Sequence, residues 1–300
     1  PTGTGTGGPG YTFQEEFVGF LHYDRPGWLA MARTNQPGSN GSQFFITTAA
    51  YSSLDYQYTL FGEVLEGLDN VRNIRLRDPQ SDPNPGTSLD TVVIVTDPAS
   101  VVTTYTAPAP GTSEQVVSGL QSLSSDQTII QASLQLSVSG ALSASEVQAS
   151  APAEIRDGFA TFMSDHNFAY RVTAILNNPT CNMDNAGFMT MSYTVDAYDS
   201  REDAAAAFAD PFWGTVPAAL GVPAAAESTE LGQTLYSGSA QACNQTATRG
   251  LAVYNYGRYI ITVDATVPAN SQAAPDVWIG RFANIFFGRG LSDVLRAELR

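Results

Sequence analysis

A stretch of small and turn-forming residues, 99–128, divides the chain into two unequal parts. It contains the run Thr106-Ala107-Pro108-Ala109-Pro110-Gly111, and this composition is typical of an extended linker, although Glu114–Leu123 could form a short helix. With 300 residues, and roughly 150 residues per domain as a guide, the chain is long enough for two domains. We therefore predict a first domain over residues 1–98, a linker over 99–128 and a second domain over 129–300.

Residues 1–98 have the pattern of a mostly β domain. A glycine-threonine loop over residues 1–10 precedes the apolar segment Gly27–Ala32. Residues rich in β-formers predict strands at Gln43–Thr47 and Tyr58–Gly62 and a closing strand at Leu89–Val95. The spacing of apolar residues predicts one helix over Gly67–Arg75.

The second part reads as an α+β domain. Alternating apolar residues predict strands at Phe168–Leu176 and Phe188–Tyr198. Ser200, followed by acidic residues, predicts the N-cap of a helix that runs through Phe208. The remaining predicted elements are a hairpin of Leu251–Tyr254 with Arg258–Thr266, a helix over Val277–Phe286, and a helix over Leu291–Leu299.

The charge of the chain excludes several classes of partner. The formal net charge is −15, and all 14 basic residues are arginine. Neither part has a basic stripe, so we expect no nucleic-acid partner and no attraction to an anionic membrane surface. No apolar run reaches the roughly 18 residues of a membrane-spanning helix. Two cysteines and the distant His166 supply too few ligands for a metal site, and no motif indicates a cofactor.

The two cysteines, Cys181 and Cys243, both lie in the second part. They could form one disulfide in an oxidising compartment or remain two buried thiols. The Ser/Thr/Pro-rich linker and the placement of both cysteines in one domain favour an extracytoplasmic setting, and hence the disulfide.

Three blocks of residues carry the clearest signal in the chain. They are Gly5-Thr6-Gly7-Gly8, then Asp24-Arg25-Pro26-Gly27-Trp28-Leu29-Ala30-Met31-Ala32-Arg33-Thr34, then Asn40-Gly41-Ser42-Gln43-Phe44-Phe45-Ile46-Thr47 with Leu54-Asp55 and Phe61-Gly62. In order and spacing they resemble the cyclophilin family of peptidyl-prolyl cis/trans isomerases, and the segment from Met31 to Thr34 is similar to bacterial members. The resemblance covers residues 1–98 and implies part of a cyclophilin-like β-barrel.

The chemistry of such an enzyme explains these residue types. An X–Pro amide has a rotational barrier of about 18–20 kcal/mol and isomerises in tens to hundreds of seconds. Lowering the barrier requires a pocket for the proline ring and a donor for the prolyl nitrogen in the twisted state, but no nucleophile or metal.

The resemblance implies substrate-binding roles for seven residues. Phe45 should form the floor of the proline pocket, with Leu54 and Tyr58 beside it. Gln43 should hydrogen-bond the substrate backbone. The implied neighbours are the Arg33 main chain, with its side chain toward solvent, and Gly5 and Ala32, which shape the adjoining groove.

Two departures from the family pattern affect the expected activity. Ser53 and Tyr58 stand where many eukaryotic members have Trp and His. The family's catalytic arginine and its first strands are expected upstream of Pro1, so no residue of this chain is assigned that catalytic role. We expect either a partial record of a longer protein or a partner chain, or the second domain, that completes the barrel.

We predict a peptidyl-prolyl isomerase that acts on proline-containing polypeptides and assists protein folding. In this reading the second domain holds clients or tethers the enzyme. The alternative is a non-catalytic extracytoplasmic binding or structural module, in which the cyclophilin-like part is only a scaffold.

Overall fold

The computed structural model describes residues 6–82, 84, 86–96, 100–101, 109–181, 183, 187–229, 231 and 233–298. The chain divides into two compact units, residues 1–108 and 109–300, and each is described separately. Among the described residues, no helix is long and apolar enough to cross a membrane.

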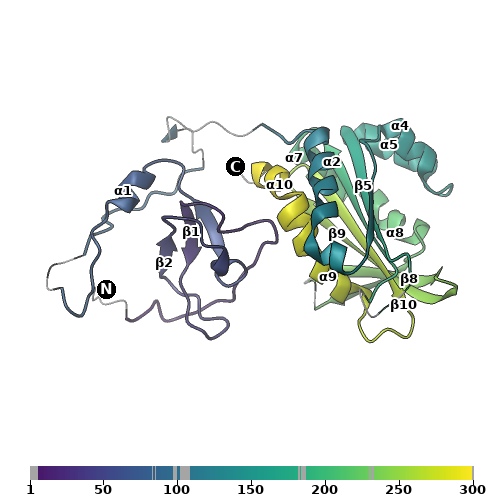
Figure 1. Cartoon of the computed structure of the whole chain (residues 1–300). Helices are drawn as coiled ribbons and strands as arrows, with labels where there is room; N and C mark the ends of the chain where they lie inside the picture. Colours follow the sequence, from purple (N-terminus) through teal and green to yellow (C-terminus); the bar gives the residue numbers. More distant parts are fainter. Residues whose placement is uncertain are drawn as a thin grey trace. The chain divides into compact units, whose positions relative to one another are not determined.

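The first unit is built on a small antiparallel sheet. Its strands are β1 (Trp28–Met31), β2 (Phe44–Ile46) and β3 (Leu60–Glu63), in the order β2-β1-β3 (Figure 1). The 3-10 helix η1 (Ser52–Leu54) and the helix α1 (Leu68–Arg72) complete it. The predicted strands and helix of residues 43–75 are therefore present, and the apolar segment Gly27–Ala32 contains β1. The expected partial barrel takes the form of this three-stranded sheet, and the described residues form no closed barrel.

The predicted closing strand at Leu89–Val95 is wrong. These residues form no strand, and the exposed fraction reaches 93% at Ile94. The residue types suit a strand, but a strand exists only where another strand accepts its backbone hydrogen bonds. β1 already has a partner on each side, and residues 89–95 pair with neither edge of the sheet.

The second unit has a seven-stranded antiparallel sheet in the order β4-β5-β6-β10-β9-β8-β7. The strands are β4 (Gln135–Val138), β5 (Phe168–Asn177), β6 (Thr190–Tyr198), β7 (Ala224–Ser228), β8 (Gln233–Ala242), β9 (Gln245–Tyr256) and β10 (Tyr259–Pro268). The hairpin predicted around residues 255–257 is β9–β10, and its strands are longer than the sequence pattern predicts. The two predicted strands of residues 168–198 are β5 and β6.

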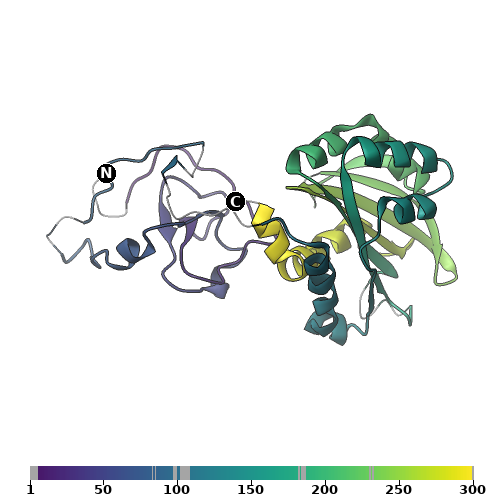
Figure 2. The ribbon, with the colours of Figure 1, turned by 90° about the horizontal axis from the view of Figure 1, so that it is seen from above.

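Helices cover both faces of this sheet (Figures 1 and 2). One layer contains α2 (Ser113–Ser122), α9 (Pro275–Ile285), the π-helix η5 (Phe286–Gly290) and α10 (Ser292–Glu298). The other layer contains α4 (Ala144–Ser150), α5 (Arg156–Asp165), α7 (Arg201–Ala209), the 3-10 helix η4 (Pro211–Thr215) and α8 (Val216–Ala219). Both faces of the central strands are therefore buried.

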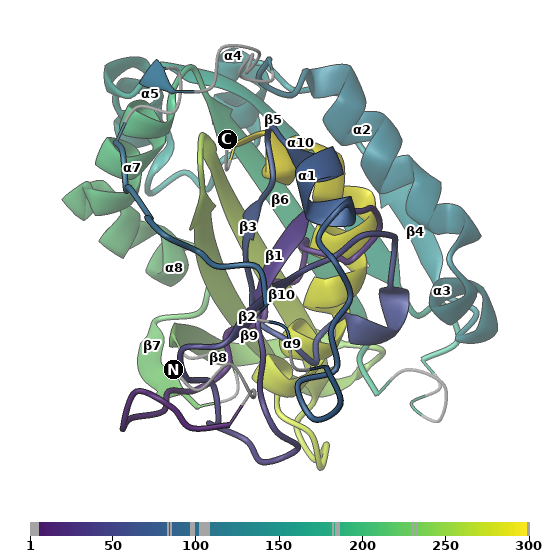
Figure 3. The ribbon, with the colours of Figure 1, turned by 90° about the vertical axis from the view of Figure 1, so that its left-hand side faces the viewer.

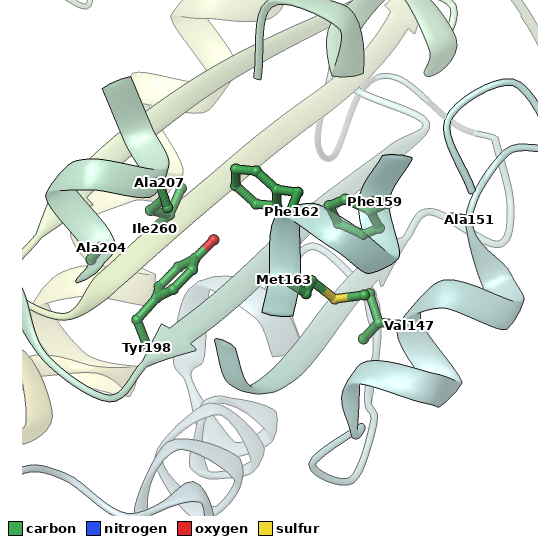
Figure 4. Close-up of a cluster of buried hydrophobic side chains, with 9 residues drawn as sticks. All are labelled: Val147, Ala151, Phe159, Phe162, Met163, Tyr198, Ala204, Ala207 and Ile260. Carbon is green, nitrogen blue, oxygen red and sulfur yellow. The ribbon is translucent and has the colours of Figure 1, made fainter. Parts of the chain in front are cut away.

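Alternation along β6 shows the two layers at residue level. Tyr193 stacks on Phe286 of the first layer, with the ring centroids 3.4 Å apart. Tyr198, five residues on, lies in a buried cluster with Phe159 and Phe162 of α5 (Figure 4). The same cluster also contains Val147, Ala151, Met163, Ala204, Ala207 and Ile260. Because successive side chains of a strand point to opposite faces, one strand serves both cores.

The linker predicted over residues 99–128 extends too far. Residues 109–128 belong to the second unit, and α2 lies beside β4 and β5, followed by η3 (Leu123–Ser125) and α3 (Gln127–Gln131) (Figure 3). Thr112 caps α2 in a capping box with Gln115, and Val116 and Leu120 are fully buried. The composition resembles a linker because small polar residues fill the exposed face, while two apolar residues four positions apart form the buried stripe.

Candidate functional site

The pairing of β1 with β2 positions the candidate site of the first unit. Ala30 pairs with Phe45 and Met31 with Phe44. The Ala32 backbone N–H then donates to the Gln43 carbonyl at 2.9 Å, which continues the pairing beyond the two strands. The side chain of Gln43 is exposed, as is suitable for a residue that contacts a peptide from solution.

A groove of about 650 Å³ lies beside this pair. Ala32, Arg33 and Gln43 line it together with Thr34, Ser39, Gly41, Ser42 and the segment 7–12. Gly7 and Gly8, from the first sequence block, form part of its wall, whereas Gly5 lies outside the described residues. Three of the seven predicted residues thus meet in one groove.

The other three predicted residues form a second group. Phe45, Leu54 and Tyr58 pack against the buried side chains of Tyr23 and Trp28. The Phe45 ring centroid is 5.6 Å from that of Tyr58 in an edge-on arrangement and 6.2 Å from that of Tyr23 in a stacked one. Among the described residues, none of these three lines the 650 Å³ groove.

The side chain of Arg33 joins the two groups, which corrects the expectation that it points to solvent. Its Nε donates to the Gln57 carbonyl at 2.6 Å, and its Nη1 donates to Glu15 Oε1 at 3.2 Å. The guanidinium lies over the Tyr58 ring, 5.8 Å from the centroid, and 19% of the side chain is exposed. A delocalised cation is more weakly hydrated than an ammonium and packs readily on an aromatic ring. Arg33 therefore lines the groove and also contacts the aromatic group.

Glu15 is a site residue that the sequence patterns missed. Both of its carboxylate oxygens accept the Gly38 N–H, at 3.1 and 3.0 Å, in addition to the Arg33 contact. Gly38 has a φ of +69°, a conformation that glycine adopts at little cost, and the Pro37-Gly38 pair is a turn signal in the sequence. These contacts, led by the backbone hydrogen bond from Gly38, hold the pKa of Glu15 below its usual value. The carboxylate thus fixes the groove loop to Arg33.

Asp55, which belongs to the third sequence block, holds Tyr23, the residue against which Phe45 stacks. Its Oδ1 accepts the Tyr23 N–H at 2.7 Å, and its Oδ2 lies 3.3 Å from His22 Nδ1. Burial raises the pKa of the Tyr23 phenol, which donates to the Tyr58 carbonyl at 3.2 Å. The ring of Tyr23 therefore stays neutral and forms a fixed support under Phe45.

In the second unit the two cysteines form a disulfide, which is one of the two alternatives that the sequence left open. Cys181 and Cys243 are bonded, with Cα atoms 5.9 Å apart. The bond links the connection after β5 to the turn between β8 and β9.

Comparison with known proteins assigns a family to part of the chain. Residues 1–96 match the family model for the cyclophilin type peptidyl-prolyl cis-trans isomerase/CLD. The prediction of a cyclophilin resemblance is therefore confirmed for this part.

Several curated relatives are named as isomerases. Peptidyl-prolyl cis-trans isomerase A of Mycobacterium tuberculosis is 54% identical over 66 residues, which is 22% of this chain and 36% of the relative. Peptidyl-prolyl cis-trans isomerase B of Streptomyces anulatus is 52% identical over 64 residues, 21% of this chain and 36% of the relative. Peptidyl-prolyl cis-trans isomerase 10 of Caenorhabditis elegans is 48% identical over 77 residues, 25% and 47% of the two chains.

A crystal structure of a Cryptosporidium parvum cyclophilin type isomerase, in the presence of the dipeptide Ala-Pro, is 42% identical. The match covers 24% of this chain and 48% of that chain, with a TM-score of 0.23. The chain thus spans about a third to a half of the length of the relatives it matches.

Proposed function

We propose that this protein accelerates cis/trans isomerisation of X–Pro bonds in polypeptides, through the cyclophilin-type sequence of residues 1–96. The observation that carries the proposal is the groove lined by Ala32, Arg33 and Gln43, in which Arg33 also lies over the Tyr58 ring that meets Phe45 edge-on. The curated relatives over the same residues are named as peptidyl-prolyl isomerases.

The geometry supports separate roles for the two groups of residues, one in binding the peptide backbone and one in contacting the proline ring. In this proposal Gln43 and the main chain at Ala32 and Arg33 hold an extended peptide in the groove. Phe45, with Leu54 and Tyr58 beside it, contacts the proline ring, because an apolar ring gains most from an aromatic surface. Such a site accelerates rotation through contacts that are stronger in the twisted state than in the planar one, and it needs no covalent step.

The second unit is proposed as an accessory domain that holds clients or tethers the first. We place the protein outside the cytoplasm, and the Cys181–Cys243 disulfide supports this setting because disulfides are rare in reducing compartments. Two free thiols in the natively isolated protein would contradict it.

An isomerisation assay on a short X–Pro peptide, with the chain as given, tests the activity. We expect relaxation well above the uncatalysed rate, and a loss of kcat/KM of about tenfold or more in Phe45→Ala, equivalent to about 1.4 kcal/mol. Phe61→Ala is the matched control, since 52% of Phe61 is exposed and it does not line the groove.

Gln43→Ala keeps the test valid if Phe45→Ala unfolds, because Gln43 is exposed. Peptide binding without any rate above the uncatalysed one, both in this chain and after the family's upstream segment is restored, would contradict the enzyme and support the non-catalytic binding module.

A further inference from the structure

A second pocket, of about 470 Å³, lies wholly within the second unit. Its wall includes three aromatic residues, Phe208, Trp213 and Tyr236, together with Asp210, Gln233 and Thr234. The volume falls within the roughly 300–1,000 Å³ of small-molecule sites in proteins. The isomerase proposal does not use this pocket, which is formed by other elements of the chain.

The pocket lies at the end of the sheet where β8 and β9 stop pairing. The pairing of β8 with β9 ends at Tyr236 and Leu251, although β9 continues to Tyr256. Gln233 and Thr234, at the start of β8, pair instead with β7. The pocket lies where β8 leaves β9, so Val253 of β9 lines it from below.

The helical layer supplies the other wall. α7 ends at Ala209, and the next residue, Asp210, is the N-cap of η4, because its Oδ1 accepts the Phe212 N–H at 2.8 Å. This turn places Trp213 at the pocket, while Phe208 lies in the last turn of α7. Because 43% of Phe208 is exposed, its ring presents apolar surface to solvent.

The charge of the wall is negative. The side chain of Asp210 is 33% exposed, and its Oδ2 lies 2.9 Å from His166 Nε2. The Phe212 N–H and then His166 hold the pKa of Asp210 below its usual value, so the group is a carboxylate at neutral pH. No arginine is among the described residues of the wall, and the chain has no lysine.

We propose that this pocket binds a small organic cation that carries an alkylated ammonium group. Aromatic rings attract such cations through their negative faces, and the gain rises when the ion is desolvated. The partly exposed carboxylate of Asp210 adds a charge of opposite sign. An anion would be repelled by Asp210, and a neutral apolar molecule would gain nothing from it.

Calorimetric titration of the full chain with choline tests the proposal, with 3,3-dimethyl-1-butanol as the uncharged molecule of the same shape. We expect choline to bind about tenfold more tightly than the alcohol, a difference that lies within the range of cation–π attraction. Phe208→Leu and Asp210→Asn should each weaken choline binding several-fold. Asp165→Asn is the matched control, because Asp165 is exposed on α5 and lies outside the pocket.

Asparagine keeps a carbonyl oxygen for the Phe212 N–H, so Asp210→Asn should preserve η4. If that variant unfolds, a choline-induced shift of the Trp213 indole N–H in NMR spectra, absent with the alcohol, decides the question. Equal affinity for the two molecules, or no binding of choline, would overturn the proposal. So would unchanged binding in folded Asp210→Asn and Phe208→Leu.

Discussion

Arg33 and Glu15 show how single contacts shape the groove of the first unit. The family resemblance assigns Arg33 a main-chain role, but its guanidinium is held between Glu15, the Gln57 carbonyl and the Tyr58 ring. Glu15 in turn holds the loop at Gly38. Because the partners lie 18 and 24 residues away from Arg33, no local pattern indicates these contacts.

The carboxylate of Glu15 should make the stability of the first unit depend on pH. Its pKa is lower in the folded state than in the unfolded state, so its contribution is present above the unfolded pKa and is lost as the pH falls through the folded pKa. We expect Glu15→Gln to lower the melting temperature at pH 7 and to have a much smaller effect at pH 3.

Thermal unfolding followed by circular dichroism at both pH values measures this difference. Glu66→Gln is the control, because Glu66 is exposed and should leave the melting temperature unchanged at either pH. An equal loss in Glu15→Gln at pH 7 and pH 3 would contradict a role for the carboxylate charge.

At the scale of elements, α7 is the helix whose start the sequence defines most clearly. Ser200 is its N-cap, and the Ser200 Oγ accepts the Asp203 N–H at 3.0 Å. The acidic residues Glu202 and Asp203 lie in the first turn, where the helix dipole favours negative charge. The prediction of this cap is confirmed, because capping depends on neighbouring residues alone.

Removal of this cap should destabilise the second unit. We expect Ser200→Ala to lower the free energy of unfolding by about 1 kcal/mol, as typical for N-caps. Urea denaturation followed by circular dichroism measures the change. Ser124→Ala, at an exposed serine of η3, should stay within about 0.5 kcal/mol of the unmodified chain. A Ser200→Ala variant as stable as this control would show that the cap contributes nothing.

One disulfide cross-links the middle of the second unit. The bond spans 62 residues of sequence, including β6, α7, α8, β7 and β8. Cross-linking so long a loop limits the unfolded chain, and the chain-entropy relation gives a stabilisation of about 4 kcal/mol.

Replacement of both cysteines by alanine should therefore lower the urea midpoint of the second unit strongly. A reducing agent should lower the midpoint of the unmodified chain toward that of the variant and leave the variant unchanged. An unmodified chain that keeps its midpoint with both thiols titrated as free would show that the bond does not stabilise the fold.

The sequence by itself determined the features that depend on neighbouring residues or on residue type. These are the three blocks of residues 5–62, the strands β2, β3, β5 and β6, the β9–β10 hairpin and the cap of α7. Of the seven predicted site residues, Ala32, Arg33 and Gln43 meet in the groove, and Phe45, Leu54 and Tyr58 meet around Tyr23. Strand periodicity and turn residues are local, so they can be read directly from the chain.

Only the tertiary structure decided which of these segments have partners. Leu89–Val95 has strand-forming residues but pairs with neither edge of the sheet, whereas α2 has linker-like residues and is anchored by Val116 and Leu120. The inward turn of Arg33 and the pocket between α7 and β8 likewise depend on residues far apart in sequence. Burial and pairing depend on the whole fold, because a hydrogen bond or an apolar contact stabilises a segment only where a partner is present.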